Sequence, residues 1–271
     1  MMHGELNLEQ LAKNYERDGV VLVRGFLNDN QLRTLEKSLD YARSNPGPMR
    51  TNFMSSMDGE FFFDFMTFRR NPHVKALCFD SELGEKLSQI VGTKEVRIFH
   101  DNILIKSGNA PPTPWHQDRP HYLVEGPKNF SVWMSPDVVP ENESLAFIPG
   151  SHKSGKIYHS RSFRDGEEIS ENSDFESLSA EEFDRLSESG ILVFSVRPGD
   201  AIIFDNRMLH SALRGIARAN RRALSLRFIG DGALLTTKYA DPTPPLHLMG
   251  MKFSDGDVPS EVWFPTVYRK V

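Results

Sequence analysis

The run RRALSLRFI at residues 221–229 shows how the second half of the chain is built. Successive side chains of a β-strand point to opposite faces, so this run divides into two sets. One face carries Arg222, Leu224, Leu226 and Phe228, and the other carries Arg221, Ala223, Ser225 and Arg227. The apolar set suits packing on helices, and the small or polar set suits the interior of a barrel. Arg221 is therefore a better candidate than Arg222 for an interior site.

Five other runs between residues 95 and 210 share this short, β-branched and aromatic character. They cover residues 96–106, 130–139, 144–148, 191–196 and 201–205. Turn residues such as Pro149-Gly150 and Pro198-Gly199 punctuate them. Many short strands with turns and no crossover helices between them predict a β-sandwich or barrel.

The first ninety or so residues are mainly helical in pattern. Apolar residues recur at helix spacing in residues 6–18, in a segment from about 29 to 45, and in 72–91, while 20–23 reads as a short buried strand. Residues 52–69 are rich in Met and Phe without a clean period, so a pocket loop and a core segment both remain open. We expect one domain over 1–271: helices to about 93, a β-body over about 94–240 packed against them, and a tail over 241–271.

Composition limits the functional classes. Lys and Arg total 32 against 37 Asp and Glu, for a net charge of −5, which gives no support for a surface that binds nucleic acid or anionic lipid. Residues 1–17 lack the apolar core of a secretory signal, and no stretch approaches the about 18 apolar residues of a membrane span. We therefore expect a cytoplasmic protein. Since Cys78 is the single cysteine, any metal site must use His and carboxylates.

An acidic segment at about 158–190 interrupts the predicted strands. It is rich in serine, and Ser179 to Glu182 reads as a capping box that opens a short helix ending near Leu186. Such a charged run is usually a solvated face. The alternative is a flap over an active site, since long insertions between barrel strands often cover sites.

Three residues form a candidate metal site. On an extended segment His116 and Asp118 would share a face while Gln117 points away, so one imidazole and one carboxylate could take adjacent corners of an octahedral ion. The pair alone is weak evidence. His210, just after the strand at 201–205, would complete the two-His, one-carboxylate triad of non-haem Fe(II) oxygenases. Arg221, eleven residues further on, could bind a carboxylate bidentately.

Taken together, these motifs resemble the phytanoyl-CoA dioxygenase family. The matching stretches are Thr113–Asp118, Leu145–His152, Arg197–Asp200, His210 and Arg221–Ser225, and the resemblance covers about residues 5–240. It implies a double-stranded β-helix, a cupin-like jelly roll, that uses Fe(II), 2-oxoglutarate and O₂. Carried over by position, His116, Asp118 and His210 match the iron ligands. Arg221 matches the arginine for the far carboxylate of 2-oxoglutarate, and Trp133 matches an aromatic residue of the cosubstrate pocket. One departure is Ala212, where members often carry a small hydroxyl.

The implied activity is hydroxylation of a substrate C–H bond with release of succinate and CO₂. Related halogenases replace the carboxylate ligand with a small residue, so Asp118 favours hydroxylation. Two alternatives stay open: a cupin-like metalloenzyme that does not use 2-oxoglutarate, and a non-catalytic jelly-roll binding protein.

The substrate class is suggested by charge. A CoA thioester would need a basic cluster at the pocket mouth, whereas the segment that could border the mouth is acidic. A small free metabolite is therefore the expected partner. Arg119 and Arg227 could hold an acidic group of it, although a structural ion pair is another role for Arg227. Trp115 and Tyr122 could face an alkyl or cationic part, or could be ordinary core rings.

Overall fold

The strands form two sheets that face each other. The computed structural model describes residues 6–54, 59–108, 110, 112–161, 167–168, 172–212, 221–238 and 243–270. The major sheet contains β1 (Val20–Val23), β2 (Thr51–Met54), β3 (Glu60–Phe65), β4 (Glu95–Ser107), β7 (Phe130–Met134), β10 (Ala201–Asp205), β12 (Arg221–Ile229) and β14 (Thr266–Arg269). The minor sheet contains β5 (Thr113–His116), β8 (Ala146–Phe147), β9 (Leu192–Val193) and β11 (His210–Ala212). A separate ribbon pairs β6 (Val124–Glu125) with β13 (Leu234–Leu235).

Strand order interleaves distant parts of the chain. The major sheet runs β1-β10-β7-β12-β4-β3-β2, with β14 also paired to β4, and the minor sheet runs β5-β11-β8-β9. The pairings within both sheets are antiparallel. Two antiparallel sheets built from interleaved strands are the predicted double-stranded β-helix, and the fold class is confirmed.

Side chains of the major sheet alternate between two cores. On β10, Ala201 and Ile203 pack toward the helices, whereas Ile202 and Phe204 point into the space between the sheets. On β7, Trp133 points inward while its neighbours Val132 and Met134 join the helix-side core. Because both faces are buried, these strands are mainly apolar, and their polar residues Ser131 and Asp205 are buried as well.

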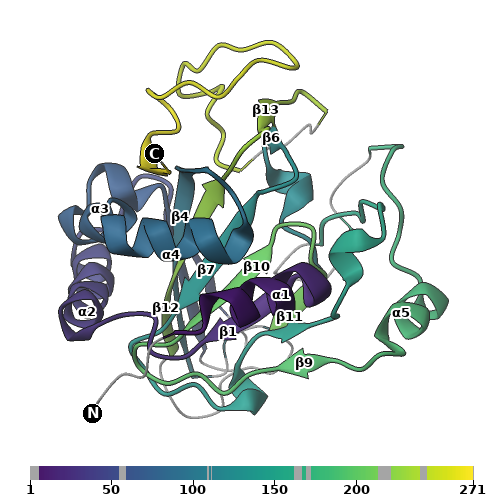
Figure 1. Cartoon of the computed structure of the whole chain (residues 1–271), viewed down its shortest axis with the longest axis horizontal. Coiled ribbons are helices and arrows are strands. Elements are labelled where there is room, and N and C mark those ends of the chain that lie inside the picture. Colours follow the sequence, from purple (N-terminus) through teal and green to yellow (C-terminus); the bar gives the residue numbers. More distant parts are fainter. Residues whose placement is uncertain are drawn as a thin grey trace.

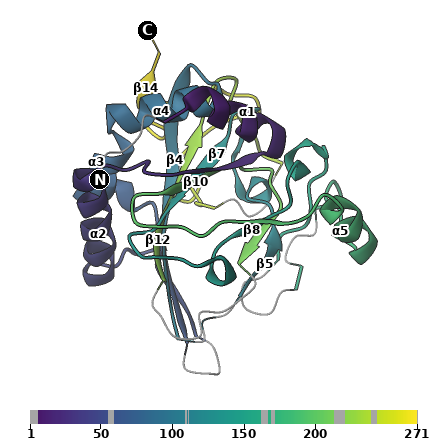
Figure 2. The same ribbon diagram turned by 60° about the horizontal axis from the view of Figure 1, so that its bottom comes forward.

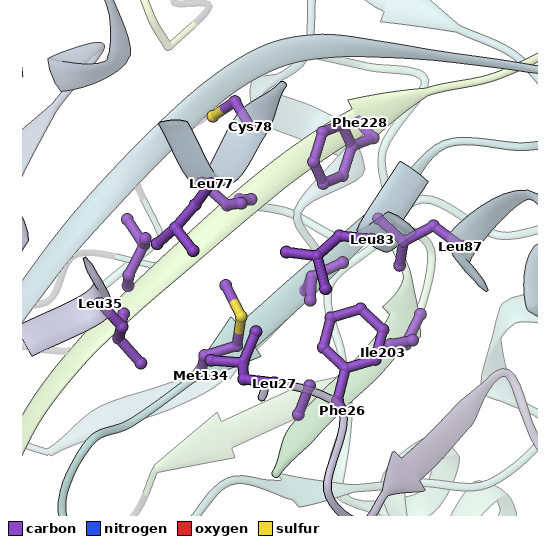
Figure 3. Close-up of a cluster of buried hydrophobic side chains, with 14 of the residues drawn as sticks. Phe26, Leu27, Leu35, Leu77, Cys78, Leu83, Leu87, Met134, Ile203 and Phe228 are labelled. Atoms are coloured by element: carbon purple, nitrogen blue, oxygen red, sulfur yellow. The ribbon is translucent and has the colours of Figure 1, made fainter. Parts of the chain in front are cut away.

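In the part of the chain that the structure describes, five α-helices accompany the sheets: α1 (Leu8–Asp18), α2 (Asp29–Ser44), α3 (Pro72–Cys78), α4 (Ser81–Val91) and α5 (Ala180–Ser187). The first four cover the outer face of the major sheet, and α5 lies on the opposite side of the molecule (Figure 1). Figure 3 shows side chains of this helix-side core, in which Leu35 and Leu83 from helices meet Met134 and Phe228 from strands. Asn28 caps α2 with a full capping box.

The segment at 52–69, for which two roles were open, contains two strands. Phe62 packs in the helix-side core and Phe61, on the other face of β3, lines an internal cavity. The helix-side face of β3 also carries Glu60 and Asp64, so Phe62 interrupts the polar–apolar alternation that marks a strand in sequence. With β1, whose strand was predicted at residues 20–23, the first 93 residues supply three strands to the major sheet, and β2 and β3 are the two that were not predicted.

Three further regions can be compared with the prediction, and one of them agrees with it. The helical block at 72–91 is two helices, because Asp80 caps α4 after a break at Phe79. In the acidic segment, α5 begins after Ser179, whose side chain accepts a hydrogen bond from the Glu182 amide at 3.2 Å as expected for a cap. The tail contributes β14, which pairs with β4.

Short 3₁₀ helices among the described residues connect the strands: η1 (Thr67–Arg69) follows β3, η2 (Arg119–His121) follows β5, and η3 (Glu141–Glu143) and η4 (Ser151–Lys153) precede and follow β8. Figure 2 shows β5 and β8 on one side of the major-sheet strands and α2 to α4 on the other. Within the described ranges, no helix combines the length and the apolar character needed to cross a membrane.

Candidate metal centre

Two histidines from neighbouring strands meet at the edge of the minor sheet. His116 ends β5 and His210 begins β11, and the two residues are register partners. Their ring centroids are 4.2 Å apart. Asp118 follows in the turn, where it caps η2 with helical backbone angles of φ −75° and ψ −29°. The predicted extended conformation of this motif is therefore wrong at Asp118, yet one ligand atom from each of the three side chains lies within 4.8 Å of the others.

Hydrogen bonds determine which ring nitrogen of each histidine can take a metal. His116 Nδ1 lies 2.8 Å from the Pro114 carbonyl oxygen, and His210 Nδ1 lies 3.0 Å from that of Met208. A carbonyl oxygen only accepts, so each Nδ1 carries the proton and each Nε2 carries the lone pair that a metal requires. His116 Nε2 is 4.0 Å from Asp118 Oδ1. A backbone carbonyl behind each ligating histidine is the usual arrangement in metal sites.

The electrostatic environment keeps the three groups in their metal-binding protonation states. Burial, with a further contribution from the neighbouring His210, lowers the pKa of His116 to about 3. Burial also lowers the pKa of His210, so both imidazoles are neutral at pH 7. Burial alone would raise the pKa of Asp118, but Arg227 and the two histidines outweigh it, and the pKa falls below its ordinary value. Asp118 is therefore an ionised carboxylate.

Two hydrogen-bonding partners hold the Asp118 carboxylate. Arg227 Nη1 lies 2.6 Å from Asp118 Oδ1, and Ser131 Oγ donates to Oδ2 at 3.1 Å. Gln117 points away from the site, as predicted, and its amide donates to the Arg207 carbonyl at 2.8 Å and accepts from the Tyr158 amide at 3.0 Å. A set of two neutral imidazoles and one ionised carboxylate fits a divalent ion such as Fe(II).

A cavity of about 400 Å³ opens beside these side chains. Alternate residues of two paired strands line it: His100, Asn102, Leu104 and Lys106 from β4, with Arg221, Ser225 and Arg227 from β12. The predicted inward face of the run at 221–229 is therefore observed. The opposite face behaves as expected too, because Arg222 pairs with Asp137 at 2.8 Å and reaches Asp40 of α2 at 3.3 Å.

The end of the cavity at Arg221 has the character expected of a carboxylate site. Arg221 is 6% exposed, and its Nη1 donates to the Glu143 carbonyl. Its guanidinium lies 6.0 Å from the centroid of the Trp133 ring, which also lines the cavity. Burial lowers the pKa of Arg221 to about 10, so it stays cationic at neutral pH.

The four predicted substrate residues fall into two groups. Tyr122 and Arg227 line the cavity and contact each other, with Arg227 Nη1 3.2 Å from the Tyr122 hydroxyl. Trp115 packs on Phe183 of α5 at a centroid distance of 5.3 Å, and Arg119 pairs with Glu125 at 2.9 Å. Neither of these last two belongs to the described lining of the cavity, so the geometry gives their substrate role no support. Both lie next to the motif in sequence, but Trp115 alternates with His116 on β5, and Arg119 lies beyond the turn at Asp118.

Several cavity residues were missed by sequence reasoning. His100 and Lys106 are polar positions within a strand that was correctly predicted, and both alternate onto its inward face. That alternation was the signal that could have identified them. Arg161 from the acidic segment and Thr243 from the tail also line the cavity. No local sequence pattern indicates either residue, because their position depends on how distant segments fold back.

Solved structures with the same architecture include two proteins of nogalamycin biosynthesis and EctD. The α-ketoglutarate-dependent epimerase SnoN of nogalamycin biosynthesis matches with a TM-score of 0.76 and 19% identity over 96% of this chain and 98% of its own. The carbocyclase SnoK of the same biosynthesis matches with a TM-score of 0.76 and 19% identity over 97% and 99%. EctD from S. alaskensis, solved with 2-oxoglutarate and 5-hydroxyectoine, matches with a TM-score of 0.70 and 20% identity over 94% and 86%. At these identities the likeness establishes the fold.

Sequence comparison places the chain in a family. No curated protein is recognisably similar to it in sequence. The family pattern described as phytanoyl-CoA dioxygenase (PhyH), however, matches residues 15–223. This range includes β1, the triad and the first three residues of β12, and it spans most of the chain. The chain is therefore a member of the phytanoyl-CoA dioxygenase family.

Proposed function

We propose that the protein is an Fe(II)- and 2-oxoglutarate-dependent dioxygenase that hydroxylates a C–H bond of a small metabolite and releases succinate and CO₂. The observation that carries the proposal is the buried cluster of His116, Asp118 and His210, whose ligand atoms lie within 4.8 Å of one another. An iron ion bound there would supply the activation of O₂ and the oxidative decarboxylation of 2-oxoglutarate.

The chain itself contributes a fixed, dry and charged site. Carbonyl oxygens behind the two imidazoles hold their orientation, and Arg227 with Ser131 holds the Asp118 carboxylate. A ligand set held in this way needs little reorganisation when the ion enters. The three residues are 2–7% exposed, so bulk water is excluded from the reacting centre.

The two ends of the cavity suggest separate roles. Arg221, beside Trp133, would bind the distal carboxylate of 2-oxoglutarate through its guanidinium fork. Tyr122 and His121 line the cavity near Asp118, where a substrate would approach. The cavity has a volume of about 400 Å³, and 2-oxoglutarate must share this space with the substrate. The remaining space suits a small metabolite better than a substrate that is attached to a large carrier.

The hydroxylation step is inferred from the ligand set. The SnoN and SnoK proteins are described as an epimerase and a carbocyclase, so the fold accommodates several outcomes. The Asp118 carboxylate argues against halogenation.

We also propose that the chain acts as one catalytic domain in the cytoplasm. Helices α1 to α4 and strand β14 pack on or pair with the same major sheet, and a protein with a single cysteine has no internal disulfide, as is usual in a reducing compartment.

The test is a substrate screen by O₂ uptake with Fe(II) and 2-oxoglutarate supplied. Small amino, carboxylic and phosphonic acids are compared with acyl-CoA thioesters, and product masses are measured. We expect a small acid to stimulate succinate formation and to gain one oxygen atom. A stimulating substrate that is isomerised or cyclised without gaining oxygen would contradict hydroxylation, and strong turnover of a CoA ester alone would contradict the small-metabolite class.

A further inference from the structure

The residue between the first two ligands has a side chain that binds the backbone of other segments. Gln117 is 1% exposed. Its amide nitrogen donates to the Arg207 carbonyl at 2.8 Å and to the Lys156 carbonyl at 3.3 Å, and its amide oxygen accepts from the Tyr158 N–H at 3.0 Å. All three partners are main-chain groups of two segments that are distant in sequence. A buried amide bound in this way fixes the relative position of the segments that it joins.

The first of these segments carries the third ligand. Arg207 lies in the connection between β10 and β11, and His210 is the first residue of β11. Within that connection, the Met208 carbonyl holds the His210 imidazole through Nδ1 at 3.0 Å. Gln117 therefore ties the turn that carries the first two ligands to the segment that orients the third.

The second segment connects Gln117 to α5. Tyr158 is 2% exposed, and its hydroxyl donates to Glu182 Oε1 at 2.8 Å. Lys156 Nζ lies 3.2 Å from the same oxygen. Glu182 belongs to the first turn of α5, so the backbone that Gln117 binds is held in turn by a side chain of this helix.

Helix α5 also packs beside the two histidine ligands. The ring centroids of Phe183 and Trp115 are 5.3 Å apart, and Trp115 is the residue before His116 on β5. Figure 2 shows α5 on the side of the molecule where β5 and β8 lie. Leu209, the residue before His210, is fully buried in the apolar cluster to which Phe183 contributes. Each histidine is therefore preceded by a residue that packs in the same cluster as α5.

We propose that Gln117 is a positioning residue of the metal centre and couples metal binding to the docking of α5. This inference rests on the proposed function, of which it uses only the binding of a divalent ion to the triad. With α5 docked, Gln117 keeps its three partners, and the ligand-bearing segments stay at the spacing that an ion requires. Because such coupling is reciprocal, an ion bound to the triad stabilises docked α5 in return.

In this arrangement α5 supports the metal site and does not act as a flap. It contributes no residue to the described lining of the cavity, whereas it packs with the residues that precede both histidines. A flap would respond to substrate. A support of this kind responds to the ion alone.

The experiment measures Mn(II) affinity by calorimetry, and amide hydrogen exchange in α5 with and without saturating Mn(II), in the absence of cosubstrate and substrate. Gln117→Met keeps the length of the side chain but removes its hydrogen bonds, and Phe183→Ser weakens the docking of α5 at a residue outside the triad. Matched controls are Gln89→Met on α4 and Phe79→Ser after α3, both on the opposite side of the molecule (Figure 1). Thermal unfolding of each variant reports its folding.

In the wild type and the controls, Mn(II) should slow hydrogen exchange in α5. Gln117→Met should bind Mn(II) about five- to tenfold more weakly, and the effect of Mn(II) on α5 should largely vanish, which a general loss of stability would not produce. Phe183→Ser should weaken Mn(II) binding about fivefold, because the ion must then dock a helix that is held less well.

Wild-type Mn(II) affinity in either folded variant would overturn this proposal alone, as would exchange in wild-type α5 that Mn(II) leaves unchanged. If Gln117→Met does not fold, Phe183→Ser and the exchange of the wild type decide. Wild-type protein that does not bind Mn(II) would overturn the proposal together with the proposed function.

Discussion

Replacing Arg227 with methionine should destabilise the metal-free protein severely, because this arginine neutralises a buried metal ligand. Its Nη1 lies 2.6 Å from Asp118 Oδ1, and the two side chains are 14% and 3% exposed. Removing one partner of such a buried pair leaves an uncompensated charge, at a cost of about 3–5 kcal/mol. Arg222→Met is a matched control on the same strand. Its pair with Asp137 is about a third exposed at the arginine, so its loss should cost only about 0–1 kcal/mol.

A bound divalent ion should restore much of the stability that Arg227→Met loses, since the ion places two positive charges beside Asp118. Urea unfolding followed by tryptophan fluorescence, with a chelator or with saturating Mn(II), measures both effects. By linkage, the variant should also bind Mn(II) more tightly than the wild type, because Arg227 no longer competes for the carboxylate. The reasoning fails if metal-free Arg227→Met is no less stable than Arg222→Met, or if Mn(II) leaves the difference unchanged.

Three further predictions concern the cosubstrate, pH and the core. Arg221→Ala should raise the 2-oxoglutarate requirement by about tenfold or more, and Arg222→Ala much less; the reverse order in steady-state kinetics would refute the assigned faces of β12. His116 is neutral when folded, with a pKa of about 3 against an ordinary value near 6.5, so metal-free protein should lose stability as pH falls from about 6.5 toward 3. In urea unfolding, the His116→Asn variant should lose less stability on acidification than the wild type does. An equal loss in the two proteins would exclude His116 as a cause of the pH dependence. Ile203→Ala in the helix-side core should lower the free energy of unfolding by about 2–5 kcal/mol. Val262→Ala, at a 73% exposed position, should change it by no more than about 0.5 kcal/mol, and equal losses in the two variants would contradict the burial assigned to these residues.

The elements that could be predicted from sequence are those in which adjacent residues face different environments, one polar and one apolar. On β12 the two faces carry chemically distinct side chains, so the strand, its bounds and its inward arginine could all be derived. On β3 the cavity-side face is apolar, but the helix-side face mixes Phe62 with Glu60 and Asp64, and the same reasoning found no period. Local alternation is informative only when one face is polar.

The candidate site shows the same limit. The types of the three triad residues were sufficient to propose a metal site, even though the conformation assumed for Asp118 was wrong, because a short turn can still deliver its carboxylate to the two histidines. Proximity in sequence was a poor guide to substrate contacts. Trp115 and Arg119 flank the triad in the chain, yet they pack against α5 and Glu125. Thr243 reaches the cavity from a tail that the family pattern does not cover.

Release of CO₂ from 2-oxoglutarate labelled at C1 tests the central claim most directly. The assay supplies Fe(II) and O₂ to the wild type, to the single alanine variants of His116, Asp118 and His210, and to Arg222→Ala as a control outside the cavity. We predict iron-dependent release of labelled CO₂ by the wild type and the control, and none above background by the three folded triad variants. Wild-type release by any triad variant would remove that residue from the iron site, and iron-independent or absent release by the wild type would contradict the proposed function.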